Sequence, residues 1–178
     1  MPLAYIALGA NLPSPAGPPD ATLAAALEHI ASLGRIAARS SLYSTAPVGF
    51  ADQPRFFNAV VALETGLAPR PLLDALLSIE RRFGRDRSAS VSNGPRTLDL
   101  DLLLYGDLVS TDSALEIPHP RLAKRAFVLV PLVEIAPDLR IPPFGLTATQ
   151  LLANLTTATE SAANSAVTLV QSPFWSSE

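Results

Sequence analysis

Gly94-Pro-Arg-Thr-Leu-Asp-Leu-Asp-Leu-Leu-Leu-Tyr-Gly106 is the stretch around which the rest of the chain is organised. From Thr97 onward polar and apolar residues alternate, and this change of face at every residue is typical of a β-strand. The predicted strand covers residues 97–104 and supplies one row of core side chains. That row consists of Leu98, Leu100, Leu102 and Leu104.

Asp99 and Asp101 share the opposite face of this predicted strand, about 6.5 to 7 Å apart. Two neighbouring carboxylates repel each other unless a cation lies between them, and a divalent metal ion is one such cation. Charges on an edge strand also discourage unwanted sheet pairing, so the Asp pair alone leaves both interpretations open. Arg96 lies just upstream, behind a rigid Gly-Pro pair, and favours a site that handles metal and phosphate.

Length and composition limit the class of protein. The 178 residues are enough for one domain with a full hydrophobic core. The absence of cysteine excludes a disulfide framework, a cysteine zinc site and a thiol nucleophile. No apolar run approaches the roughly 18 residues of a membrane span, and the first residues lack the basic charges of a signal peptide. We therefore expect a soluble, cytoplasmic protein that does not bind membranes.

Charge is unevenly distributed along the chain. The formal net charge of −3 gives no general attraction to nucleic acid, so we expect no nucleic-acid partner. A local group of arginines in such an acidic protein indicates a small polyanionic ligand. The group comprises Arg81, Arg82, Arg85, Arg87 and Arg96.

The order of predicted elements indicates the fold. Apolar periodicity predicts strands over 3–8, 35–43, 56–64 and 97–104, with one helix between the first two strands and another between the last two. The order strand, helix, strand, strand, helix, strand is typical of the ferredoxin-like βαββαβ fold, an α+β architecture. We expect an antiparallel sheet with both helices on one face and the active site on the other, open face.

C-terminal additions follow this unit. A further helical region is predicted from Arg121 onward, with a kink or a break at Pro131. Residues 1–152 are assigned to the catalytic domain. Residues 153–178 are rich in Ser, Thr, Ala and Asn and are predicted to form a weakly ordered or peripheral tail.

Several motifs resemble those of the 6-hydroxymethyl-7,8-dihydropterin pyrophosphokinases of folate biosynthesis. They follow one another in order from about residue 4 to 142. They are Ala4 to Leu12, Tyr43 to Pro47, Asp52 to Pro54, Phe57 to Ala59, Glu80 with Gly84 to Arg87, Gly94 to Asp101, and Pro118-His119 with Arg125, Phe127, Pro131 and Leu132.

The resemblance implies a reaction and its cofactors. Pyrophosphate would pass from ATP, the co-substrate, to the hydroxymethyl oxygen of the pterin, giving the pterin diphosphate and AMP. Two Mg²⁺ ions would be held by Asp99 and Asp101. Such transfer needs charge neutralised on both sides of the attacked phosphorus, which paired metals on paired carboxylates provide. Positioning and electrostatics would then suffice for catalysis, without a covalent intermediate.

The resemblance also assigns roles to individual residues. Guanidinium groups suit the phosphates because their forked donors match phosphate oxygens and stay charged. The catalytic residues would be Arg85, Arg96, Asp99 and Asp101, and the ATP-binding residues Glu80, Arg87, Arg96, Leu102, His119 and Arg125, with Leu102 against the adenine.

Several of these assignments have a plainer alternative. Arg85 and Arg87 could also be solvated charges at the end of a helix. His119, which lies between two prolines, could instead cap a turn. Arg125 would alternatively pair with an acidic neighbour. Glu80 would alternatively only orient an arginine.

The pterin-binding residues implied by the resemblance are Thr45, Val48, Phe56, Asn58 and Phe127. Phe56 and Phe127 would stack on the flat ring and Asn58 would read its amide edge, helped by backbone groups near Thr45 and Val48. Aromatic faces with a few polar readers are what a planar heterocycle needs. A phenylalanine on an apolar helix is also a common core residue, so that alternative stays open for Phe127.

The chain departs from the family at four positions. Asn93 precedes the Gly-Pro pair where an aromatic residue is frequent, and Pro120 follows the histidine where a tyrosine is common. Ser88 stands where a lysine assists ATP, and Phe56 replaces a frequent tyrosine. These departures bear on lid closure and ATP affinity, because the loop over 85–93 is of the kind that closes over phosphotransfer sites.

Two other functions fit parts of the sequence. A non-catalytic ferredoxin-like module that binds a nucleotide or pterin would share the fold. A glycosyltransferase would share the Asp-x-Asp pattern, but the chain lacks the large nucleotide-sugar domain. The pyrophosphokinase, acting on small molecules as a monomer, is the function that we carry forward.

Overall fold

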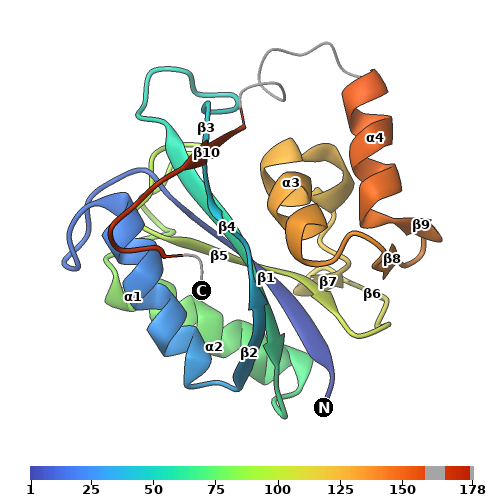
Figure 1. The fold of residues 1–178 in the computed structure, drawn as a ribbon. Helices are drawn as coiled ribbons and strands as arrows, with labels where there is room; N and C mark the ends of the chain where they lie inside the picture. The colour runs from blue at the N-terminus through green and yellow to red at the C-terminus, as the bar shows by residue number, and fades with distance from the viewer. Residues whose placement is uncertain (159–166, 177–178) are drawn as a thin grey trace.

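The computed structural model describes residues 1–158 and 167–176, and it contains an antiparallel sheet with helices on both faces (Figure 1). The strands of this sheet are β1 (Leu3–Ala10), β2 (Arg35–Arg39), β3 (Leu42–Thr45), β4 (Phe56–Glu64), β5 (Asp99–Tyr105) and β10 (Thr168–Val170). The α-helices are α1 (Pro19–Ala31), α2 (Pro69–Arg82), α3 (Ala126–Ile135) and α4 (Ala148–Ala158). Smaller elements are the hairpins β6 (Ser110–Asp112) with β7 (Leu115–Ile117) and β8 (Arg140–Ile141) with β9 (Leu146–Thr147), and the 3-10 turn η1 (Leu122–Lys124).

The strand order confirms the ferredoxin-like prediction. The sheet runs β10-β3-β4-β1-β5, all neighbours are antiparallel, and β2 and β3 pair with successive parts of β4. The single strand predicted over 35–43 is divided because a side chain interrupts the ladder. The backbone N–H of Val60 donates to the Ser40 hydroxyl at 3.0 Å, and the Ser40 N–H donates to the Val60 carbonyl at 2.9 Å.

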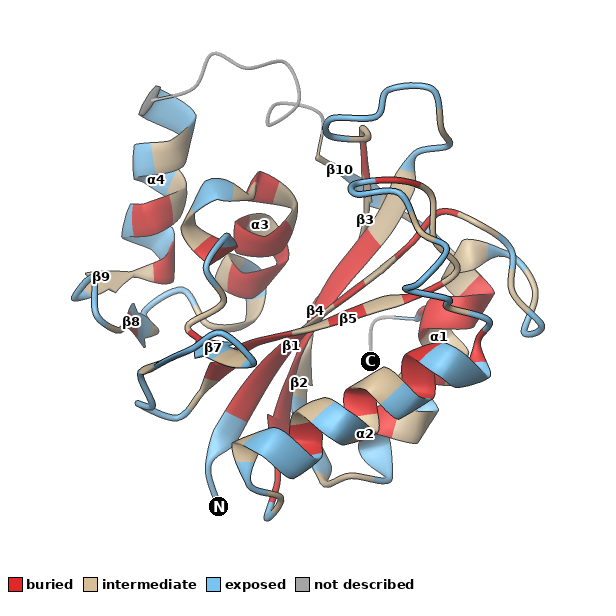
Figure 2. Ribbon diagram, turned by 180° about the vertical axis from the view of Figure 1, so that it is seen from behind, coloured by how far each residue is buried: buried red, intermediate tan, exposed pale blue. Residues whose placement is uncertain are grey.

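Helices α1 and α2 cover one face of the sheet (Figure 2). Each begins with proline in its first turn, where the missing N–H costs nothing. In α2, Leu72, Leu76 and Ile79 recur at helical spacing and are buried against the sheet. Both helices therefore lie on the same face, as predicted.

The other face is not open, and in this respect the sequence-based expectation is wrong. Helices α3 and α4 pack there and bury a second apolar cluster with inward residues of β1, β4 and β5. Helix α3 is apolar on nearly every side, so it packs both against the sheet and against α4 (Figure 1). The part of this face that α3 leaves uncovered becomes the wall of a pocket.

A β-bulge in β5 divides the four leucines that were predicted to share one face of the strand. Ile6 of β1 faces Leu102 and Tyr5 faces Leu104, so Leu103 has no partner on β1. The extra residue reverses the alternation. Leu98, Leu100 and Leu102 consequently join the cluster under α1 and α2, while Leu103 and Leu104 join the cluster under α3 and α4.

The described part of the tail belongs to the sheet. Helix α4 extends beyond residue 153, and β10 pairs with β3 at the sheet edge. Trp175 is 4% exposed and its indole Nε1–H donates to the Ser40 carbonyl at 3.0 Å. The expected weak order therefore does not hold for 167–176, whereas 159–166 and 177–178 lie outside the described residues. The domain boundary after residue 152 stays a prediction.

Helix α3 continues through Pro131, so of the kink or break predicted there the break does not occur. Proline forfeits one backbone hydrogen bond in a helix interior. Burial of Val128, Leu129 and Leu132 against the sheet compensates for this loss. Among the described residues, no helix has the length and apolarity to cross a lipid bilayer.

Candidate active site

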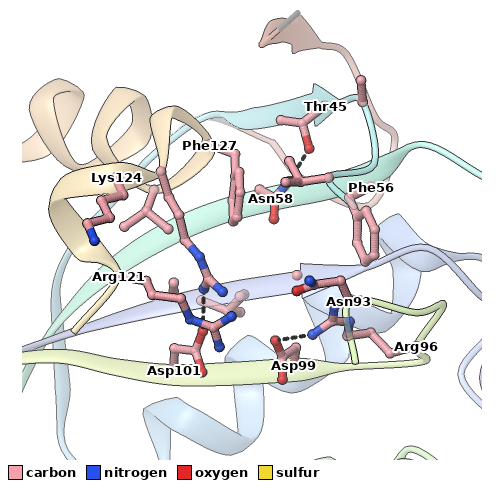
Figure 3. Close-up of a pocket in the computed structure, with 17 residues that line it drawn as sticks. Thr45, Phe56, Asn58, Asn93, Arg96, Asp99, Asp101, Arg121, Lys124 and Phe127 are labelled. Atoms are coloured by element: carbon pink, nitrogen blue, oxygen red, sulfur yellow. Dashed lines mark hydrogen bonds and ion pairs between the residues drawn. The ribbon is translucent and has the colours of Figure 1, made fainter. Parts of the chain in front are cut away.

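A pocket of about 380 Å³ lies over β1 and β5, on the side of the sheet that carries α3 (Figure 3). One end is formed by β3, β4 and the loop between them, and the other by η1 and the start of α3. Its lining joins backbone from β1, aromatic rings, two acids and several cations. The residues are Ala7, Leu8, Gly9, Thr45, Ala46, Val48, Phe56, Asn58, Asn93, Arg96, Asp99, Asp101, Arg121, Lys124, Arg125, Phe127 and Val128.

Asp99 and Asp101 both face this pocket, as the alternation of the strand predicts. The Arg96 guanidinium donates to Asp99 at 2.9 Å, and Arg87 approaches the same carboxylate at 3.5 Å. Arg125 approaches Asp101 at 3.5 Å. Burial first, and the neighbouring Asp99 carboxylate next, raise the pKa of Asp101. A bound cation would relieve this unfavourable charge.

The acid pair fits a hard divalent cation. Carboxylate oxygens are the ligands that Mg²⁺ prefers, and Mg²⁺ keeps several water or phosphate ligands beside one or two carboxylates. Within the described ranges, no cluster of three or more His, Cys, Asp or Glu side chains is arranged to hold a metal. Asp99 and Asp101 are the carboxylates that would hold such an ion.

Arg96 is held in place by several contacts. Its backbone N–H donates to the Asn11 side-chain oxygen at 2.8 Å, and its carbonyl accepts from the Asn11 N–H at 3.0 Å. Its guanidinium also lies 5.3 Å from the centre of the Phe56 ring. The strand entry therefore fixes this cation beside Asp99.

Glu80 is paired with an arginine, and its predicted role in ATP binding stays a prediction. Its side chain is 1% exposed and accepts hydrogen bonds from Arg87 at 2.9 and 2.7 Å and from the Leu100 N–H at 2.8 Å. It lies under β5 and lines neither pocket described here. Glu80 thus links the end of α2 to the strand that carries the acids.

Arg85 is the predicted site residue with the weakest connection to the pocket. It lines neither pocket, and its Nε atom is buried without a hydrogen-bond partner among the described residues. Burial lowers the pKa of its guanidinium, while the charge of Asp99 opposes this effect. The structure thus leaves its predicted catalytic role untested.

A second pocket of about 320 Å³ lies on the far side of Asp101. Leu102, predicted to contact adenine, lines it together with His119 and Pro120. Arg87 also lines it, and apolar residues of α2 and the β6–β7 hairpin complete the wall. Asp101 lines both pockets and forms their common wall.

His119 is an uncharged member of this site. Burial first, and then the charge of Arg125, lower its pKa to about 4. Its Nδ1 accepts the Arg121 backbone N–H at 3.1 Å, so its proton at neutral pH lies on Nε2, which is 3.9 Å from an Asp101 oxygen. His119 therefore offers a neutral hydrogen-bond donor rather than a positive charge.

The five predicted pterin-binding residues all line the first pocket: Thr45, Val48, Phe56, Asn58 and Phe127. The Asn58 amide nitrogen donates to the Thr45 hydroxyl at 2.7 Å, which leaves the amide oxygen as the acceptor for a ligand. Phe127 lies at the pocket wall rather than only in the core (Figure 3).

Three of the departures noted in the sequence have definite places. Asn93 lines the first pocket in the left-handed conformation, with φ 58°, and its carbonyl accepts from Gln53 at 2.8 Å. Pro120 lines the second pocket, whereas Ser88 lines neither and donates to Asp86 at 2.6 Å. Asn93 thus belongs to the lining of the first pocket, whereas Ser88 does not belong to either lining.

Sequence reasoning did not predict three features of the lining. These are Arg121, Lys124 and the backbone of β1 around Gly9. A Cβ atom at Gly9 would lie 3.0 Å from the Asn58 side-chain oxygen, so glycine allows the sheet to approach the amide. The two cations follow the Pro-His-Pro motif closely, and this proximity was the available signal.

Comparison of the sequence with known proteins shows the family to which the chain belongs. The sequence profile of the 7,8-dihydro-6-hydroxymethylpterin-pyrophosphokinase (HPPK) family matches residues 5–137. The chain belongs to the HPPK family. A 2-amino-4-hydroxy-6-hydroxymethyldihydropteridine pyrophosphokinase of Pseudomonas aeruginosa is 50% identical over 138 residues, covering 78% of this chain and 83% of the relative. One from Methylorubrum extorquens is 46% identical over 157 residues, covering 87% and 94%.

Solved HPPK structures share the fold. The Plasmodium falciparum HPPK-DHPS wild type with pteroate superposes with a TM-score of 0.67 at 14% identity, over 88% of this chain and 42% of that chain. This chain therefore spans less than half of that solved chain. At this identity the likeness shows the fold alone. The HPPK family membership confirms the main functional prediction, an enzyme of the pyrophosphokinase class, and does not support the non-catalytic alternative.

Proposed function

We propose that the chain transfers the pyrophosphoryl group of ATP to the hydroxymethyl oxygen of 6-hydroxymethyl-7,8-dihydropterin. The observation that carries this proposal is the position of Asp101 in the common wall of two pockets, with Asp99 beside it in the first pocket. One pocket suits a flat heterocycle and the other an adenine. The reaction would take place where the pockets meet.

The pterin would bind in the first pocket. Asn58 has a free amide oxygen for the donor edge of the ring, and Phe56 and Phe127 provide apolar surface beside it. The ring would then direct its hydroxymethyl group toward the acid pair. This arrangement puts the attacking oxygen next to the site of transfer, which is the main requirement of a reaction driven by positioning.

ATP would bind with its adenine against Leu102 in the second pocket and its phosphates crossing Asp101. The pterin oxygen forms a bond to the β-phosphorus and loses its proton, while the bond from this phosphorus to the bridging α,β oxygen breaks. AMP leaves with that oxygen. Arg87, Arg96 and Arg125 provide positive charge around the phosphates, and His119 donates a neutral hydrogen bond.

Two Mg²⁺ ions held by Asp99 and Asp101 would neutralise phosphate charge and polarise the attacked phosphorus. Glu80 keeps Arg87 close to the acids, and Arg85 is retained as a catalytic residue on the family resemblance. We also propose a monomer in the cytoplasm, consistent with the cysteine-free sequence. Size-exclusion chromatography tests the monomer.

The test is an assay with protein, MgATP and the reduced hydroxymethylpterin, in which nucleotide products are separated. We expect AMP in a one-to-one ratio with pterin diphosphate. Asp101→Asn keeps the shape but removes the charge and should lower turnover by about 10²-fold or more, with an unchanged circular dichroism spectrum. Production of ADP, or a near-normal rate in Asp101→Asn, would contradict the proposal.

A further inference from the structure

Arg121 borders the first pocket, and none of the roles described above uses its side chain. Its backbone is firmly placed: its N–H donates to His119 Nδ1 at 3.1 Å, and the next residue, Leu122, is fully buried. The His119 N–H in turn donates to the Leu103 carbonyl of β5 at 2.8 Å. Arg121 is therefore fixed relative to the strand that carries Asp101.

The side chain of Arg121 extends over Asp101 into the pocket (Figure 3). Lys124 comes from the same turn, but Figure 3 shows it directed away from the two acids. Of these two cations, only Arg121 is therefore aimed at the place where the phosphates would lie.

The charges around the pocket are unbalanced. Arg96 pairs with Asp99, and Arg125 lies beside Asp101. Among the residues that the structure describes, no carboxylate forms an ion pair with the Arg121 guanidinium. The arginines that line the pocket thus outnumber its two carboxylates, and this excess of positive charge indicates an anionic ligand.

The position of Arg121 specifies which anion. His119 and Pro120 line the second pocket, assigned to the nucleotide, whereas Arg121 lines the first. It thus lies on the pterin side of Asp101. The phosphates on that side are those that leave ATP and become attached to the pterin.

We propose that Arg121 binds the transferred diphosphate and holds it on the pterin product. Its guanidinium fork donates to non-bridging phosphate oxygens, a geometry that suits arginine and not lysine or glutamine. This inference rests on the proposed function, because it takes the first pocket to be the pterin site.

The experiment compares the wild type with Arg121→Gln and Arg121→Lys by isothermal titration calorimetry in Mg²⁺. One ligand is the pterin diphosphate and the other is the unphosphorylated hydroxymethylpterin. We expect Arg121→Gln to weaken binding of the diphosphate about tenfold or more, since charged hydrogen bonds have this strength. Arg121→Lys should lose part of the affinity, and neither variant should change binding of the unphosphorylated pterin.

Arg82→Gln is the matched control, because it removes one exposed arginine charge outside both pockets. It should leave both affinities unchanged. Unaltered diphosphate affinity in Arg121→Gln, or equal loss for the two ligands, would overturn the inference. Failure of the proposed function would appear separately, as wild-type protein that forms no AMP.

Discussion

At the scale of single residues, the side chain that would read the pterin depends on one hydroxyl. Asn58 is 7% exposed, and its amide is oriented by the 2.7 Å hydrogen bond to Thr45, which is itself buried. Without that acceptor, the amide nitrogen and oxygen are no longer distinguished. The orientation that leaves the oxygen free for a ligand would then be only one of several.

Thr45→Val should therefore raise the pterin KM about fivefold, the equivalent of a net hydrogen bond of about 1 kcal/mol. Valine keeps the volume of threonine and removes only the hydroxyl. Steady-state kinetics with varied pterin measure the change, and the KM for ATP should not move. Thr45→Ser retains the hydroxyl and serves as the control, so a KM increase of equal size in that variant would refute the explanation.

Residue-level prediction was most successful where spacing carried the signal. The alternation around Asp99 and Asp101 was enough to place both carboxylates on one side of a strand, and family motifs located Asn58 and Phe127. Arg121 was not predicted because its direction depends on a turn anchored to β5 through His119. A local pattern of apolar residues does not predict such a contact between distant parts of the chain.

At the scale of elements, the Glu134 carboxylate of α3 connects this helix to β3 by hydrogen bonds. Glu134 accepts hydrogen bonds from the Ser41 N–H and hydroxyl and from the Tyr43 hydroxyl at 2.7 Å. Helix α3 also begins beside Arg125 and carries Phe127. Together with the apolar packing of α3 on the sheet, this attachment holds the helix side of the first pocket against the strand side.

The attachment predicts a pH dependence of stability. Burial first, and then the hydrogen bond and charge of Glu134, raise the pKa of Tyr43 to about 12, whereas an unfolded tyrosine has a pKa of about 10. A raised folded-state pKa contributes stability that is complete below pH 10 and is lost as the pH rises toward 12.

We expect the wild type to exceed Tyr43→Phe in the free energy of unfolding by a constant amount from pH 7 to 9. This difference should shrink at pH 11. Urea unfolding of both proteins at each pH provides the measurement, and other tyrosines cancel in the comparison. A difference that stayed the same at pH 11 would mean that the Tyr43 hydroxyl is not protected by Glu134.

The coverage of the second sheet face illustrates what element patterns do not reveal. Helix α2 has one apolar face, so the sequence predicted which face packs against the sheet. Helix α3 is apolar all round, and its pattern does not say which side meets the sheet. The expectation of an open face followed from counting only the βαββαβ unit.

At the scale of the whole molecule, the C-terminal segment closes over the sheet edge. After β10 the chain turns so that Ser172 donates to Asp20 in α1 at 2.8 Å and Trp175 enters the core. Its partners on β3 and at Ser40 lie more than a hundred residues earlier in the chain. Sequence patterns are local, and for this reason the tail looked unstructured.

Trp175→Ala should lower the free energy of unfolding by about 3 kcal/mol, as for other large-to-small aromatic substitutions in a core. Phe174→Ala is the matched control because Phe174 is the neighbouring residue and is 51% exposed. It should change the free energy of unfolding by less than about 0.5 kcal/mol. Urea unfolding measures both. Equal effects would show that the indole does not anchor this segment.

The extra residue at Leu103 lets β5, an edge strand of the sheet, contribute side chains to both apolar clusters. Leu100 and Leu102 pack in the cluster under α1 and α2, while Leu103 and Leu104 pack in the cluster under α3 and α4. We therefore expect a substitution that changes the volume of one cluster to need no compensating change in the other, and Asp101 to stay in place between them. The scaffold of this enzyme is therefore free to diverge on one side at a time without moving its acids.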